Sequence, residues 1–298
     1  MTVVVIAGDV PSIGVMGEYT ARRLVVDGAA QEGRAEFIDQ MAQALGERGS
    51  VLVVHPSWST GGAGGLIALA RGALHTDRIA AVPLDLPPLA LSLVADQLAF
   101  VAPHVPPGRL AGLASRLSVM VCAGAWLHSV ARLENVPVGL AEHAVSYLPG
   151  RGGFSVLAAP SPGVHRITRA EPVQAIERPR LGPVLLAAAD QNGDPGWLRE
   201  SLQGALGATS IVPAAVQPLS DTYWGSRRHT EFVAFSGHPD AVQQAVTSAG
   251  GRPCGWCGEP TALPECSFCG MAVRDGSGDV SGGAAGVVAG SATRNGVR

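Results

Sequence analysis

The sequence predicts an α/β protein, in which a parallel sheet covered by helices is followed by a smaller ferredoxin-like α+β domain. Three observations lead to this fold class. Short apolar runs alternate with stretches of helical periodicity over the first half of the chain, separated by Gly- and Pro-rich turns. The second half has the element order β-α-β-β-α. Its last helix leads directly into two pairs of cysteines.

In the first half, strands and helices follow one another with short connections. Strands are predicted at Thr2–Ala7, Val51–Val54, Ile79–Leu84, Leu117–Cys122 and Phe154–Ala159, each an apolar run bounded by turn residues. Helices are predicted at Arg34–Arg48, Leu66–Leu74, Leu89–Val101, Leu110–Leu117 and Trp126–Leu133. Residues 8–32 are predicted to form a loop with a hairpin near 22–28.

A Pro-rich, charged connector over residues 160–183 separates the two halves. Beyond it, strands are predicted at Val184–Ala188, Ser210–Val212 and Glu231–Ser236, and helices at Pro195–Leu206 and Pro239–Ser248. Residues 251–256 could supply the last strand of a ferredoxin-like sheet. We therefore expect an α/β domain over 1–165, a βαββα(β) domain over 183–253, a metal module over 254–272 and a disordered tail over 275–298, which is rich in Gly, Ser and Ala.

The composition excludes several classes of function. The formal net charge of the 298 residues is −3, which gives no basic field for nucleic acid or an anionic membrane. No lysine is present, so this chain can form no Schiff base and has no P-loop lysine. The abundance of Ala, Gly and Val without Lys is typical of a GC-rich bacterium. The chain enters an apolar strand without a charged leader, and the apolar run 79–102 is interrupted by Asp and Pro, so we expect a cytoplasmic protein with no membrane span.

Four of the five cysteines form two Cys-x-x-Cys pairs, Cys254/Cys257 and Cys266/Cys269, with eight residues between them. Each pair is followed by a glycine that permits a sharp turn, so two such turns could present four thiolates to one ion. Residues 252–272 resemble the zinc-ribbon family, and that resemblance implies a structural zinc with a closed coordination shell. Two disulfides or four free thiols are the alternatives, and iron could replace zinc.

A Gly-rich turn, residues 57–65, lies between a predicted strand and a predicted helix. Backbone N–H groups can converge there, and the helix N-terminus favours an anion. The turn resembles the phosphate loop of ParA/MinD-type ATPases, but Gly65 and Leu66 stand where that loop needs Lys and Ser/Thr. We therefore expect a phosphate, carboxylate or ribose rather than triphosphate hydrolysis. The candidate ligand residues are Ser59, Thr60, Gly61, Gly62, Gly64 and Gly65; the alternative is a purely structural turn.

Other candidate residues carry weaker signals. His55, Asp85 and Cys122 lie near the predicted carboxyl ends of strands, where functional residues of open α/β sheets collect. A Cys122/His55 or Cys122/His128 nucleophilic pair is conceivable, but the apolar run around Cys122 favours a buried structural thiol. The pairs Glu142-His143 and Arg227-Arg228 complete the set of candidates.

These observations leave three classes of function. We expect a cytosolic bacterial zinc-binding protein that acts as a binding or assembly module, with a protein partner or a second copy of itself. The alternative is an enzyme that binds a small anionic substrate at the 57–65 turn. A nucleic-acid-associated factor ranks third, because only the adjacent arginines support it.

Overall fold

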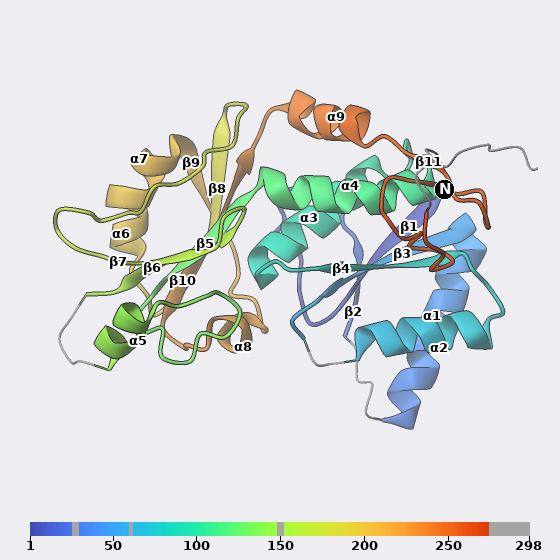
Figure 1. The fold of residues 1–298 in the computed structure, drawn as a ribbon, viewed down its shortest axis with the longest axis horizontal. Helices are drawn as coiled ribbons and strands as arrows, with labels where there is room; N and C mark the ends of the chain where they lie inside the picture. Colours follow the sequence, from blue (N-terminus) through green and yellow to red (C-terminus); the bar gives the residue numbers. More distant parts are fainter. Residues whose placement is uncertain (26–29, 60–61, 148–151, 274–298) are drawn as a thin grey trace, which may run out of the picture.

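Two sheets lie side by side in the computed structural model, which describes residues 1–25, 30–59, 62–147 and 152–273 (Figure 1). Helices α3 and α4 run between the sheets, and the N-terminus and the cysteine module both lie at the end of the molecule away from the second sheet. The tail predicted over 275–298 lies outside the described residues. Within the described part of the chain, no helix has the length and apolar content to cross a membrane.

The first sheet is parallel and has the strand order β2-β1-β3-β4. Its strands are Arg22–Leu24 (β2), Thr2–Ala7 (β1), Ser50–Pro56 (β3) and Ile79–Leu84 (β4). Helices α1 (Gln31–Arg48) and α2 (Ala63–Ala73) cover one face, and α3 (Pro88–Val101) and α4 (Pro107–Met120) cover the other. The predicted α/β class, with a parallel sheet covered by helices, is confirmed.

The second sheet is mixed and has the order β7-β6-β5-β10-β8-β9. Its strands are Gly163–Arg166 (β7), Phe154–Ala159 (β6), Cys122–Leu127 (β5), His229–Ser236 (β10), Val184–Gln191 (β8) and Ala208–Pro213 (β9). One face packs against a helical stretch made of α6 (Pro195–Trp197), a π-helical turn (Leu198–Leu202) and α7 (Gln203–Leu206). The other face meets α3, α4 and the short helix α8 (Ser220–Trp224). The remaining helices are α5 (Leu140–Ser146) and α9 (Pro239–Ser248).

The element order β-α-β-β-α predicted for the second half is present, but the strands do not pair as in a ferredoxin-like sheet. β8 pairs in parallel with β9 on the side where the fourth strand was expected, and β5 pairs with the other side of β10. Residues 252–253 (β11) pair instead with Pro260–Thr261 (β12) inside the cysteine module. The 160–183 connector thus joins strands of one sheet and does not mark the end of a sheet.

The stretch around Cys122 also differs from its prediction. Most of the strand expected at 117–122 is the last part of α4, which ends at Met120. Of the helix expected at 126–133, the first two residues belong to β5 (122–127) and residues 128–133 form no helix. Every residue of β5 is buried, because the strand lies between β10 and β6. A Cβ at Gly124 would lie 2.1 Å from the carbonyl oxygen of Val156, so only glycine permits this strand pairing.

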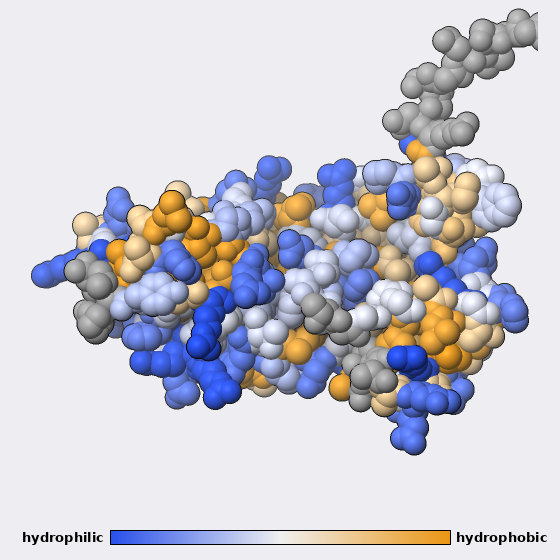
Figure 2. All heavy atoms as spheres, turned by 60° about the horizontal axis from the view of Figure 1, so that its bottom comes forward, coloured by the Kyte–Doolittle hydropathy of each residue, from blue (hydrophilic) through white to orange (hydrophobic). Residues whose placement is uncertain are grey.

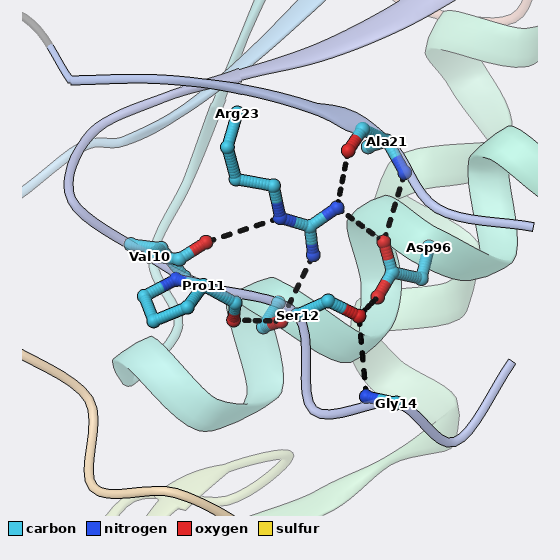
Figure 3. Close-up of polar contacts among 8 residues, drawn as sticks. Val10, Pro11, Ser12, Gly14, Ala21, Arg23 and Asp96 are labelled. Carbon is cyan, nitrogen blue, oxygen red and sulfur yellow. Dashed lines mark hydrogen bonds and ion pairs between the residues drawn. The ribbon is translucent and has the colours of Figure 1, made fainter. Parts of the chain in front are cut away.

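The segment after β1 is a loop that ends in the edge strand β2. Residues 22–24 of the predicted hairpin pair in parallel with β1, and its turn lies outside the described residues. A buried ion pair fixes it to α3 (Figure 3): Arg23 Nη1 lies 2.5 Å from Asp96 Oδ1. The same carboxylate accepts hydrogen bonds from Ser12 Oγ at 2.7 Å and from the Ala21 amide at 2.9 Å. Asp96 is completely buried and has hydrogen-bond donors on both oxygens, so this network is structural.

Candidate functional site

The carboxyl ends of the first sheet's strands face the second sheet, and the Gly-rich turn lies at this edge. The Ser57 amide donates to the Leu84 carbonyl at 3.0 Å, which joins the ends of β3 and β4. Trp58 Nε1 donates to the Leu86 carbonyl at 2.9 Å. These contacts bring the turn after β3 and the turn after β4 together, at the position where open α/β sheets hold their ligands.

Aromatic side chains connect this edge to helix α8. The rings of Trp58 and Tyr223 meet edge to face with centroids 5.0 Å apart, and Tyr223 and Trp224 meet at 4.7 Å. Tyr223 and Trp224 are buried, while Trp58 is half-buried. Burial, together with the charge of Asp85, raises the pKa of Tyr223, so its phenol stays neutral. The edge therefore has an apolar aromatic wall on the side of the second sheet.

The Gly-rich turn leads into α2, an eleven-residue helix whose N-cap is Gly62, with a left-handed φ of 70°. Among the described residues, no side chain caps this helix. Gly64 and Gly65 lie in its first turn and are exposed, and a Cβ at either one would meet no atom within 4 Å. Apolar residues gather on the surface over α2, where Leu69 is 45% exposed (Figure 2). Open space above a helix N-terminus can accept an anion. Thr60 and Gly61 lie outside the described residues.

A buried carboxylate that sequence reasoning missed lies behind the aromatic wall. Glu231 on β10 is fully buried. Its Oε1 accepts a hydrogen bond of 2.8 Å from the amide of Leu89, which lies at the start of α3, and its Oε2 accepts one from Ser220 Oγ. Burial raises the pKa of Glu231 to about 7, although both hydrogen bonds favour the charged form. A single acidic residue within the apolar run Glu231–Phe235 is the sequence signal that could have identified it.

The nucleophilic pairs considered for Cys122 are not formed. Cys122 and His128 lie at opposite ends of β5, about 20 Å apart for a strand of this length. His55 belongs to the first sheet, and burial lowers its pKa. Burial raises the pKa of Cys122 to about 12, so this residue is a neutral thiol, as its apolar sequence context indicates.

The remaining candidates lie apart from the carboxyl edge of the first sheet or are held by local contacts. Glu142 and His143 belong to α5, where His143 packs on the ring of Tyr147. Arg227 lies 3.8 Å from Asp221, and Arg228 Nε donates to the Asn192 carbonyl at 3.4 Å.

The four cysteines of the two pairs come together as the spacing predicts. Their sulfur atoms all lie within 4.8 Å of one another. Cys254 Sγ lies 3.6 Å from Cys269 Sγ, and Cys257 Sγ lies 3.5 Å from Cys266 Sγ. A disulfide needs about 2.05 Å, whereas four thiolates on one zinc lie about 3.8 Å apart. Gly258 and Gly270 have positive φ values of 76° and 74°, as the turns require.

The cysteine module is attached to the first sheet. The Ser267 carbonyl accepts from the Ala81 amide of edge strand β4 at 3.3 Å and from Arg71 Nη2 at 2.6 Å. Glu259 pairs with Arg78 at 2.6 Å and accepts from the Gly108 amide of α4. Phe268 is buried in the same core as α3 and α4. The module therefore covers the β4 edge of the parallel sheet, which would otherwise expose unpaired backbone groups.

Comparison with solved structures identifies the fold. The chain is similar to a DegV family protein of Corynebacterium glutamicum, with a TM-score of 0.56 and 16% identity over 80% of this chain and 97% of that one. It is similar to a fatty-acid-binding DegV family protein of Thermus thermophilus, with a TM-score of 0.56 and 11% identity over 79% and 99% of the two chains. The chain is also similar to a stearic-acid-binding protein of Eubacterium ventriosum, with a TM-score of 0.56 and 10% identity over 82% of this chain and 100% of that one.

These likenesses define a DegV-like two-domain α/β fold. At these identities they concern the fold alone. The sequence matches no family model and none of the curated proteins.

Proposed function

We propose that this protein binds the carboxylate of a fatty acid at the turn between β3 and α2. The observation that carries the proposal is the uncapped, glycine-rich start of α2 at the carboxyl edge of the first sheet. Two of the proteins with the same fold are described as binding fatty acids, one of them stearic acid. Of the two anion classes expected at this turn, a carboxylate is therefore favoured over a phosphate.

Charge and access together favour an anion at the start of α2. A helix N-terminus carries about half a positive charge and offers amide donors to an anion. Glycines at 64 and 65 leave the backbone open, so that a carboxylate can approach the amides. The aromatic wall of Trp58 and Tyr223 provides apolar surface near the turn for the acyl chain. The proposal is binding of an amphiphile without chemical conversion.

We propose in addition that Cys254, Cys257, Cys266 and Cys269 hold one structural zinc. Four sulfurs within 4.8 Å of one another would close the coordination shell of a zinc ion, which leaves no position for a substrate. The zinc would keep the module folded against β4 and α4, because the module has few apolar residues of its own. Its role would be to stabilise the domain that carries the ligand site.

Titration with a fatty acid and with matched variants tests the carboxylate site. Stearate should bind saturably, and stearyl alcohol at least about tenfold more weakly, because charge-assisted hydrogen bonds would be lost. Gly64→Val should weaken stearate binding by a similar factor. Gly72→Val is the matched control: Gly72 lies near the other end of α2, and a Cβ there meets no atom within 4 Å.

Equal affinity for the acid and the alcohol would contradict recognition of the carboxylate. Equal loss of affinity in Gly64→Val and Gly72→Val would contradict the placement of the site at the start of α2.

A further inference from the structure

A cavity lies away from the Gly-rich turn, between the end of α4, the start of β5, the 177–181 segment and helix α9. Its volume is about 530 Å³, within the range of about 300–1,000 Å³ common for small-molecule sites. Val121 and Cys122 at the start of β5 and Ala241 and Ala245 on α9 line it with buried apolar side chains.

Three arginines line this cavity: Arg116 on α4, and Arg178 and Arg180 on the segment before β8. None of the three forms an ion pair or a hydrogen bond with another described residue. Glu177 is the acidic residue of the lining, which leaves a formal charge of +2 in a chain whose net charge is −3. A concave surface that concentrates positive charge attracts anions from solution.

We propose that this cavity binds a phosphate monoester with an apolar body. A phosphate monoester carries a charge between about −1.5 and −2 at neutral pH, which matches the excess charge of the lining. Guanidinium groups bind phosphate oxygens in a bidentate manner, and Gln244 on α9 offers a further amide donor. The apolar floor would take the ester's organic group, and the neutral thiol of Cys122 leaves that floor uncharged. This ligand and this site are separate from the carboxylate site proposed at the start of α2.

Binding of 1-naphthyl phosphate to the full-length protein, followed by the ligand's fluorescence, tests the proposal. We expect one saturable site with submillimolar affinity, at least about tenfold tighter than for 1-naphthol or inorganic phosphate, since either lacks one half of the recognised group. 1-Naphthoate should bind more weakly than the phosphate. Arg178→Gln and Arg180→Gln should each weaken binding by about tenfold or more.

Arg227→Gln is the matched control, because its side chain is 91% exposed and it lies at the opposite end of β10 from the cavity. Unchanged binding in Arg227→Gln and in Gly64→Val would support a site that is separate from the start of α2. The absence of saturable binding up to about 10 mM would overturn the proposal. Equal losses of affinity in Arg178→Gln, Arg180→Gln and the control Arg227→Gln would also overturn it, as would displacement of the naphthyl phosphate by stearate. Equal affinity for naphthoate would overturn the assignment to a phosphate.

Discussion

Replacement of Glu231 by glutamine should remove a pH-dependent part of the free energy of unfolding. The carboxyl group is fully buried between α3 and α8, and its pKa is raised from 4.5 to about 7. Between these two values the folded protein holds a proton that the unfolded chain releases. Stability from this group is therefore fully present below pH 4.5 and is lost as the pH rises through 7.

The magnitude follows from the shift. Each pH unit in this window costs about 1.4 kcal/mol, so the free energy of unfolding falls by about 2–3 kcal/mol between pH 5 and pH 8 through this group alone. Glutamine cannot ionise, yet its carbonyl oxygen can accept from the Leu89 amide and its NH₂ group can donate to Ser220 Oγ. Relative to Glu231→Gln, the wild type should thus lose about 2–3 kcal/mol over this range.

Urea unfolding of both proteins at several pH values measures the difference, in which all other titrating groups cancel. Glu200→Gln is the control, because Glu200 is exposed in the helical stretch before β9. If the free energies of unfolding of wild type and Glu231→Gln depend on pH in the same way, the reasoning is refuted. It is also refuted if the wild type becomes more stable relative to the variant as the pH rises.

Three further predictions concern packing and the metal. Phe268→Ala should destabilise the protein by about 3–5 kcal/mol in denaturant unfolding, because this ring is buried against the first sheet's helices. Cys257→Ser should release zinc in elemental analysis and speed hydrogen exchange in edge strand β4; unchanged exchange there would argue against the observed docking. Gly124→Ala should reduce the yield of folded protein, because its Cβ would overlap the Val156 carbonyl. Gly46→Ala is the control: a Cβ at this position on α1 meets open space, so this variant should raise the free energy of unfolding by about 0.5–1 kcal/mol.

The sequence was sufficient to predict those elements whose signal lies within one short stretch of the chain. The apolar runs of β1, β3 and β4 and the helix before β3 were predicted correctly, because a single stretch of chain carries each signal. The cysteine cluster follows from the spacing of two Cys-x-x-Cys pairs. The ion it would hold stays a prediction.

Long-range pairing was not predictable from these patterns. β5 consists largely of small residues with little strand propensity, and its place is set by β10, about a hundred residues further along the chain. The apolar residues Val119–Val121 resemble a strand, yet α4 continues through Met120. The attachment of the cysteine module depends on contacts such as Ser267 with Ala81, which no sequence period reveals. The aromatic wall likewise combines Trp58 with a distant tyrosine, Tyr223.

The most direct test of the carboxylate site is a structure of the protein in complex with stearate, supported by amide chemical-shift changes on titration. We expect the carboxylate oxygens within hydrogen-bond distance of backbone amides at residues 62–65, with the acyl chain directed toward Trp58 and Tyr223. A carboxylate bound among Arg116, Arg178 and Arg180, or amide shifts absent from the start of α2, would contradict the proposed site.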